Sequence, residues 1–225
     1  MKLLIFDIDG VLIDVSQSYN LAIKKTVEFF LGRVIDIDVV DEFKNKPGMN
    51  NDWDCTEAII NDYGASFEKR VIIKKFQEYY LGKDFTGLIR NEKLLLNEGN
   101  IKALSKKYNL AIFTGRPKEE AIFILNKFKI KQYFKIIVAM EDVQQEKPNP
   151  EGLNNIITKL NANKKDVVYI GDSIDDSLAA KSAEIEFIGV IPQYGNKEEL
   201  TTIFKNNNAK IVLKNIKDIV KLNKF

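Results

Sequence analysis

Acidic and phosphate-binding side chains follow four short apolar segments of the sequence. Asp7 and Asp9 come directly after the first segment, and Thr114 comes after the second. Lys147 lies in a proline-bracketed turn after the third segment, and an acidic cluster at positions 172–176 follows the fourth. Carboxylates act as nucleophiles, general acids or metal ligands, while a hydroxyl and an ammonium group bind a phosphoryl group. The four segments together predict phosphoryl transfer at one site.

Each of these segments also has a purely structural interpretation. Asp7 and Asp9 are suited to capping a tight turn, and residues 114–117 are typical of a simple helix start. Lys147 on its own is explained as a solvated loop lysine, and the acids at 172–176 as an N-terminal helix cap. These interpretations do not explain why four complementary groups occur at four corresponding places in the chain, so we favour the catalytic one.

Six short runs of aliphatic and β-branched residues predict the buried strands of a sheet. The runs are Leu3–Phe6, Leu110–Phe113, Ile136–Val138, Val167–Ile170, Phe187–Val190 and Ile211–Leu213. Helical spacing between them predicts helices, which we place at 120–128, 153–160 and 174–183. This alternation indicates an α/β fold with a Rossmann-like parallel sheet. Ligands bind beyond the carboxyl ends of such strands, where all four groups of polar residues lie.

The segment 15–91 interrupts the alternation of strands and helices. It has no pattern of a buried strand, but apolar residues at helical spacing predict helices at Tyr19–Leu31, Thr56–Tyr63 and Phe67–Leu81. We therefore expect two domains. Residues 1–14 and 92–225 are expected to form the catalytic core, and residues 15–91 an inserted helical cap over the carboxyl edge of the sheet.

The composition excludes several classes of function. The 225 residues carry 34 Lys and Arg against 32 Asp and Glu, and this charge of +2 does not favour nucleic acid or an anionic membrane as a partner. The sequence has no His, which excludes Ser-His-Asp and Cys-His catalysis, and Cys55 is its single cysteine. Its apolar runs are too short to span a bilayer or to form a signal peptide. We expect a cytoplasmic monomer or homodimer that binds neither nucleic acid nor membrane.

Four motifs give the chain a resemblance to a known superfamily. DIDGVL, TGR, KPNP and GDSIDD occur in the order that is typical of the haloacid dehalogenase superfamily, and the match covers essentially the whole chain. The helical insertion resembles the first cap class of that superfamily. DVSQSYNLAI, NNDWD and TGRPKEEA are similar to a small phosphatase-like clade, some members of which are linked with histidine-biosynthesis enzymes. The resemblance implies a magnesium-dependent phosphatase with a Rossmann-like core.

The resemblance also implies a role for each residue that matches a motif. Asp7 would form an aspartyl phosphate, while Asp9 would protonate the leaving oxygen and later activate water. Mg²⁺ would be held by Asp7, the backbone carbonyl of Asp9 and Asp172. Asp176 is favoured over Asp175 as a further acid that reaches the metal directly or through water. The implied phosphate-binding residues are Gly10, Thr114, Gly115, Arg116 and Lys147.

Asp9 favours a phosphatase over a dehalogenase, because the dehalogenases of the superfamily lack an aspartate at this position. A sugar-phosphate mutase, a phosphonatase that uses a cap lysine such as Lys44 or Lys46, and a non-catalytic binding module remain alternatives. We expect the substrate to be a small phosphorylated metabolite that contacts Asn51 and Trp53 in the cap. Packing of Trp53 between cap helices explains that residue equally well.

Overall fold

The computed structural model describes residues 1–49, 51–192 and 197–222. The chain divides into two compact units, one of Met1–Ile13 with Leu94–Phe225 and the other of Asp14–Lys93. The assignment of the larger unit as a catalytic core and of the smaller as its cap stays a prediction. Within the described ranges, no helix is both long enough and apolar enough to cross a membrane.

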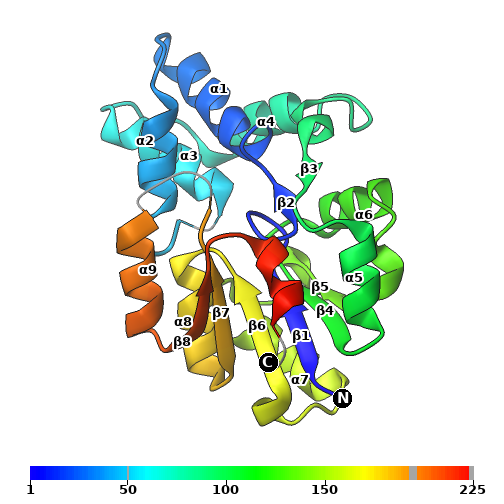
Figure 1. Ribbon diagram of the computed structural model, residues 1–225. Coiled ribbons are helices and arrows are strands. Elements are labelled where there is room, and N and C mark those ends of the chain that lie inside the picture. The colour runs from blue at the N-terminus through cyan, green and yellow to red at the C-terminus, as the bar shows by residue number, and fades with distance from the viewer. Residues whose placement is uncertain (50, 193–196, 223–225) are drawn as a thin grey trace. The chain divides into compact units, whose positions relative to one another are not determined.

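The larger unit is built on a six-stranded parallel sheet (Figure 1). Its strands are β1 (Leu3–Phe6), β4 (Asn109–Phe113), β5 (Ile136–Val138), β6 (Val167–Gly171), β7 (Glu186–Val190) and β8 (Ala209–Leu213). They are arranged in the order β5-β4-β1-β6-β7-β8, and every neighbouring pair is parallel. All six predicted strands and the α/β class are therefore confirmed. This order places the ends of β1, β4 and β6 side by side.

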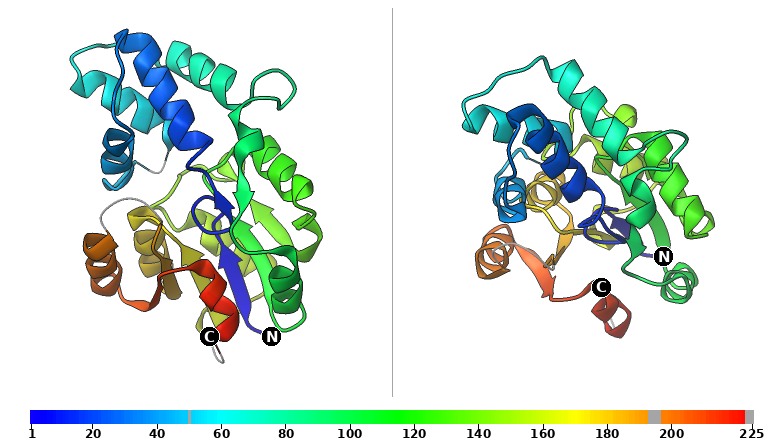
Figure 2. Two further views of the ribbon diagram at one scale, coloured as in Figure 1. Left: turned by 45° about the horizontal axis from the view of Figure 1, so that its top comes forward. Right: turned by 90° about the horizontal axis from the view of Figure 1, so that it is seen from above.

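Helices cover both faces of this sheet (Figures 1 and 2). One face packs against α7 (Glu151–Lys159), α8 (Ile174–Ala183) and α9 (Lys197–Asn206). α5 (Glu98–Ser105) and the 3₁₀ helix Ile216–Lys221 lie on the opposite face. The remaining helices of this unit are α6 (Lys118–Lys127) and the 3₁₀ helices Lys131–Tyr133, Met140–Asp142 and Lys164–Asp166.

Burial on both faces explains why the strands are apolar without interruption. Leu3 and Ile5 of β1 belong to the core cluster under α7 and α8, and the alternate residues Leu4 and Phe6 are equally buried on the other face. Successive side chains of a strand point to opposite faces, so a strand covered on both sides needs an apolar residue at every position. A fully buried Leu or Ile stabilises the fold by about 1.5–3 kcal/mol, which makes this layer rigid enough to hold a site at its edge.

The smaller unit is helical. Its elements are α1 (Tyr19–Leu31), α2 (Ile37–Lys44), α3 (Asp52–Asp62), α4 (Lys69–Tyr80) and the 3₁₀ helix Leu88–Asn91. α1 packs against the other three α-helices, and the ring of Tyr19 stacks on Tyr80 with 4.0 Å between centroids. The bounds predicted for α1 are confirmed, while α3 begins four residues earlier than predicted. The short strands β2 (Ile13–Asp14) and β3 (Lys93–Leu94) pair where the chain passes between the two units.

Candidate active site

Asp7 extends the central strand β1 by one residue and is held there by the sheet. Its backbone N–H donates to the carbonyl of Ile170 in β6 at 2.9 Å, and its side chain is 6% exposed. The chain then turns back at Gly10, which has φ +68°, a conformation that favours glycine. A Cβ atom at this position would also overlap the Asp172 carboxylate. Glycine therefore allows the turn to lie directly against the acidic cluster.

The acidic cluster begins where β6 ends and α8 starts. Ser173 is the N-cap of α8, and its hydroxyl and the Asp176 carboxylate form a capping box. Oδ2 of Asp176 accepts hydrogen bonds from Asp172 N at 3.1 Å, Ser173 N at 3.0 Å and Ser173 Oγ at 2.8 Å. Oδ1 accepts from the Tyr169 hydroxyl at 2.6 Å. Helix capping thus explains Ser173 and part of Asp176, as the structural interpretation predicts.

Lys147 is buried in the site, so its interpretation as a solvated loop residue is wrong. Its Nζ atom lies 2.7 Å from Oδ1 of Asp176 and 2.9 Å from Oδ1 of Asp7. The rings of Phe113 and Tyr169 lie 5.0 and 5.5 Å from the same nitrogen, within the range of cation–π contacts. Two carboxylates and two aromatic rings therefore enclose the ammonium group.

The turn that carries Lys147 leads directly into a helix. Pro150 is the N-cap of α7, which begins at Glu151. The Asn149 side chain accepts a hydrogen bond from Glu151 N at 2.9 Å. Asn149 therefore stabilises the turn before the helix, because asparagine side chains commonly bond the backbone two residues ahead.

The end of β4 supplies Thr114 and Arg116. Thr114 N donates to the carbonyl of Val138 at 3.0 Å, and the Thr114 hydroxyl oxygen accepts from Arg116 N at 3.1 Å, with Gly115 between them. A hydroxyl that accepts in this way still carries a proton to donate. The Arg116 side chain is fully buried, and its Nε donates to Oδ1 of Asp9 at 2.6 Å. The structure thus gives Arg116 a protein partner, and its contact with phosphate stays a prediction.

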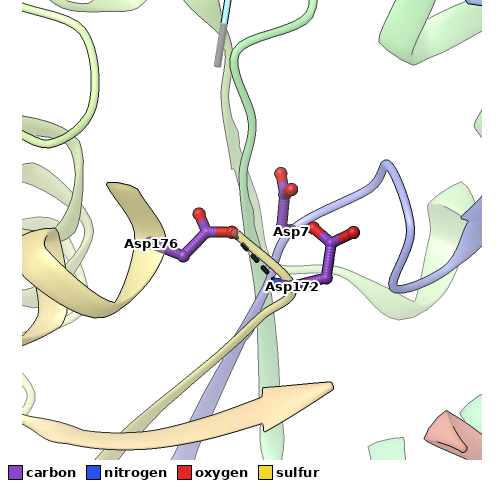
Figure 3. Close-up of side chains that lie close together, drawn as sticks. All are labelled: Asp7, Asp172 and Asp176. Atoms are coloured by element: carbon purple, nitrogen blue, oxygen red, sulfur yellow. Dashed lines mark hydrogen bonds between the residues drawn. The ribbon is translucent and has the colours of Figure 1, made fainter. Parts of the chain in front are cut away.

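Three carboxylates form a group that could hold a metal ion. Asp7, Asp172 and Asp176 each offer an oxygen within 4.8 Å of the others, and Figure 3 shows the three side chains gathered at the ends of β1 and β6. Oδ1 of Asp7 is buried and contacts the Lys147 ammonium at 2.9 Å. Lys147 is shared with Asp176, so the three carboxylates gain from a further cation, and carboxylate oxygens suit hard ions such as Mg²⁺.

Burial and the excess of acid shift the pKa values in this group. Burial, followed by repulsion from Asp176 and Asp9, raises the pKa of Asp7 to about 7, although Lys147 acts in the opposite direction. Burial also disfavours the charged forms of Lys147 and Asp176, but their mutual attraction outweighs it. The pKa of Lys147 is therefore raised and that of Asp176 lowered. Lys147 stays charged, and Asp7 is the carboxylate whose ionisation most needs a further cation.

The larger unit brings most of the predicted site residues together, in contacts that join the ends of β1, β4 and β6 and the turn before α7. The residues in these contacts are Asp7, Asp9, Gly10, Thr114, Arg116, Lys147, Asp172 and Asp176. Asn51 and Trp53 lie in the smaller unit, where the Asn51 side chain accepts from Trp53 N at 3.0 Å and caps α3. Tyr169 and Phe113 were not predicted as site residues, because an aromatic residue inside a strand pattern is read as core.

Comparison with known proteins gives the family of this chain. A family model described as haloacid dehalogenase-like hydrolase matches residues 4–190. The chain also matches a predicted phosphoglycolate phosphatase from Haemophilus somnus over 100% of this chain and 98% of that one, with a TM-score of 0.81 and 20% identity. The chain therefore belongs to the haloacid dehalogenase-like hydrolase family, as the four motifs predict.

The curated relatives include two that are at least 30% identical to this chain. A phosphorylated carbohydrates phosphatase from Thermotoga maritima is 32% identical over 197 residues, which cover 85% of this chain and 86% of that protein. A protein from Phytophthora nicotianae named imidazoleglycerol-phosphate dehydratase is 30% identical over 198 residues. The match covers 85% of this chain but only 43% of the Phytophthora protein. The chain thus spans most of one relative and less than half of the other.

Proposed function

We propose that this chain is a magnesium-dependent phosphomonoester hydrolase in which Asp7 forms an aspartyl phosphate. One observation carries the proposal: the Lys147 ammonium lies between Asp7 and Asp176, which form a group of three carboxylates with Asp172 at the carboxyl edge of the sheet. A buried lysine in this place reduces the negative charge that otherwise repels a phosphate ester. The named phosphatases among the relatives support the same class of reaction.

The charges of the site support a divalent cation. Asp7, Asp9, Asp172 and Asp176 are four acids at one edge of the sheet, where Arg116 pairs with Asp9, and Lys147 pairs with Asp7 and Asp176. Because five donor contacts already surround the Asp176 carboxylate, we place Asp7 and Asp172 as direct ligands, with the Asp9 carbonyl. When bound, Mg²⁺ would neutralise charge on the phosphoryl oxygens as a Lewis acid.

In the first step an Asp7 oxygen attacks phosphorus, and the bond between phosphorus and the leaving oxygen breaks. Asp9 gives its proton to that oxygen, so the product leaves as an alcohol. Arg116 Nε donates to Oδ1 of Asp9 at 2.6 Å and so holds the orientation of this carboxyl group. The Asp9 side chain is 24% exposed, so a substrate can reach it. Lys147 and the Thr114 hydroxyl bind the phosphoryl oxygens as charge develops on them.

In the second step water attacks the phosphorus atom of the aspartyl phosphate. Asp9, now a carboxylate, accepts the proton of that water, and the bond between phosphorus and the Asp7 oxygen breaks. Asp7 returns as a carboxylate and inorganic phosphate leaves. Asp9 therefore regains the proton that it gave up in the first step, and the cycle is balanced.

A screen of phosphorylated metabolites tests this proposal directly. We expect phosphate release with Mg²⁺, loss of release in excess chelator, and no turnover by Asp7→Asn with Mg²⁺ present. Asp166→Asn is the matched control, because Asp166 is an exposed acid of the same unit and its variant should keep full turnover. Turnover by Asp7→Asn equal to that of the wild type would contradict the proposed nucleophile. A product in which phosphate has moved to another carbon would indicate a mutase instead.

Chemical trapping tests the covalent step separately from turnover. Borohydride reduces an acyl phosphate, so an aspartyl phosphate trapped during turnover becomes homoserine. We expect a mass spectrum of the digested protein to place homoserine at Asp7 when substrate is present and not when it is omitted. Active enzyme that shows only aspartate at this position would favour direct attack by water.

We also propose that the substrate is a small phosphorylated metabolite and that Asn51 and Trp53 contact its non-phosphate part. Trp53 lies in the first turn of α3 in the smaller unit and is only partly buried. Trp53→Ala should change the order of preferred substrates in a panel. Trp53→Phe, which keeps an aromatic ring, should retain most of the wild-type order. Unchanged preferences in Trp53→Ala would mean that the ring only packs the helices.

A further inference from the structure

Tyr169 places a hydroxyl inside an otherwise apolar layer of the sheet. The residue lies in the middle of β6, is 0% exposed, and packs its ring against Phe113 and Phe187 at centroid distances of 6.0 and 6.2 Å. Phenylalanine would fill the same space without burying a polar atom, and burying one costs free energy unless it is hydrogen-bonded. Packing alone therefore does not explain why this position has a tyrosine and not a phenylalanine.

The hydroxyl has one close acceptor, and that acceptor belongs to the site. Tyr169 Oη donates to Oδ1 of Asp176 at 2.6 Å, whereas the carbonyl oxygen of Phe113 is 3.4 Å away. The same Oδ1 atom lies 2.7 Å from Nζ of Lys147. The tyrosine hydroxyl and the lysine ammonium thus share one carboxylate oxygen, and a hydrogen bond to a charged acceptor is strong.

The position of this shared oxygen sets the position of the lysine. Oδ2 of Asp176 is fixed by three donors from the start of α8, and the tyrosine fixes the rotation of the carboxylate from the other side. Lys147 reaches from there to Oδ1 of Asp7 at 2.9 Å. Without the hydroxyl, Oδ1 of Asp176 would have fewer donors and would attract the ammonium more strongly, away from Asp7.

We propose that Tyr169 is a positioning residue for the reaction: its hydroxyl holds Asp176, and through Asp176 it keeps the Lys147 ammonium against Asp7. This inference deepens the proposed function and rests on it for its catalytic consequence. The link from Tyr169 to Lys147, by contrast, can be measured on the protein whether or not it turns over a substrate.

Tyr169→Phe is the test, because it removes the hydroxyl and keeps the ring. We expect kcat to fall about 10–100-fold, as is typical when an outer partner of a site is removed, with a smaller change in KM. In the Lys147→Met background the same change should cost little more, because a residue that acts through Lys147 has nothing left to position. Equal losses in both backgrounds, or a full kcat in Tyr169→Phe, would overturn the inference.

Tyr80→Phe is the matched control. Tyr80 is also 0% exposed, and its hydroxyl donates to a buried carboxylate, that of Glu92, at 3.0 Å in the smaller unit. Both variants should lower the melting temperature, but only Tyr169→Phe should lower kcat. A loss of kcat that follows the loss of stability in both variants would indicate a merely structural role.

A spectroscopic measurement separates this inference from the proposed function. With ¹³C at the lysine Cε atoms, the Lys147 signal can be assigned by its absence in Lys147→Met. It should move in Tyr169→Phe, which retains the ring over the ammonium, and stay in place in Tyr80→Phe. If the signal moved but the protein had no phosphatase activity, the effect of Tyr169 on Lys147 would be supported and the proposed function would be rejected. An unmoved signal in an active enzyme would reject the link alone.

Discussion

Each of the two units buries a carboxylate that accepts a hydrogen bond from a tyrosine, yet the surroundings of the two acids differ. In the smaller unit, Glu92 Oε1 accepts from the Ser18 hydroxyl at 2.8 Å and from the Tyr80 hydroxyl at 3.0 Å, both neutral donors. In the larger unit, Asp176 contacts Tyr169 and also the charged Lys147, which in turn contacts a second acid.

The difference shows what each cluster can do. Hydroxyl donors around Glu92 tie α4 and the residue before α1 to one point, as expected of a structural contact. The cluster around Lys147 has more acids than cations and holds a carboxylate whose pKa burial raises to about 7. Such an arrangement costs folding free energy and is typical of a site that completes its charge balance with a ligand. Stability should therefore depend on the first cluster, and both stability and turnover on the second.

Lys147→Met should produce the largest change. It removes the ammonium that contacts Asp7 and Asp176 and leaves both acids buried without it, which we expect to cost about 3–5 kcal/mol of unfolding free energy. Loss of a donor to the transferring group should lower kcat about 10²–10³-fold. Urea unfolding and steady-state kinetics measure the two effects.

Lys118→Met provides the comparison for that variant. Lys118 pairs with Asp142 at 2.6 Å, but its side chain is 52% exposed, so the pair should contribute only about 0–1 kcal/mol. If Lys147→Met lowered the unfolding free energy and kcat no more than Lys118→Met, the cluster around Lys147 would have no role beyond that of a surface ion pair. The proposed difference between the two units would then be rejected.

The raised pKa of Asp7 predicts a pH effect on stability without metal. A group whose pKa is higher in the folded state stabilises the fold below its unfolded pKa, and this contribution is lost as the pH rises through the folded value. For Asp7 the loss should run from about pH 4 to about pH 7, with an upper bound of about 4 kcal/mol at about 1.4 kcal/mol per pKa unit.

Asp7→Asn should remove this pH dependence. In chelator, the unfolding free energy of Asp7→Asn minus that of the wild type should increase as the pH rises from 4 to 8. The same difference for Asp166→Asn should not change with pH. Addition of Mg²⁺ at pH 8 should recover stability for the wild type more than for Asp7→Asn, because the cation binds the ionised carboxylate. If the unfolding free energies of Asp7→Asn and the wild type changed equally with pH in chelator, the raised pKa of Asp7 would be contradicted.

Ser18→Ala tests the other side of the comparison. Loss of one donor to the buried Glu92 should lower the unfolding free energy by about 1–3 kcal/mol. Tyr80→Phe should have a similar effect, and the double variant should be non-additive, because both hydroxyls bond the same oxygen. Turnover per folded molecule should be unchanged in each. A selective loss of turnover in Ser18→Ala would mean that the Glu92 cluster is more than structural.

Most of the larger unit could be predicted from the sequence, because strands buried on both faces are uninterrupted apolar runs and their ends carry the candidate site residues. The helices α2, α5 and α9 were not predicted. α2 and α5 have eight residues each, and α9 has only two buried residues, Leu200 and Phe204, so their periodic patterns are weak. Short amphipathic helices depend on tertiary packing more than on local pattern.

The residues of the site could be predicted more fully than their contacts. The contact of Arg116 with Asp9 joins positions 107 residues apart and depends on β4 lying next to β1. The contact of Tyr169 with Asp176 spans seven residues, but the tyrosine ring satisfies the strand pattern and conceals the role of its hydroxyl. Pairings of this kind follow from strand order and side-chain direction, which a single sequence does not specify.

We expect the smallest loss of stability from substitution of Asn51. This residue is the N-cap of a helix in the smaller unit and can be compared with an N-cap in the larger unit. Its side chain accepts from Trp53 N at the start of α3, as that of Asn97 in the larger unit accepts from Asn100 N at 2.9 Å at the start of α5. Asn51→Ala and Asn97→Ala should each lower the unfolding free energy by about 0.5–2 kcal/mol.

Aspartate caps a helix as well as asparagine, so Asn51→Asp and Asn97→Asp should both keep their stability. The aspartate at position 51 nevertheless adds a negative charge. If Asn51 contacts a phosphorylated substrate, as we propose, Asn51→Asp should raise KM through repulsion of an anion, while Asn97→Asp should not. KM values equal in the two aspartate variants would assign Asn51 to helix capping alone, and the smaller unit would then have to select its substrate through other residues.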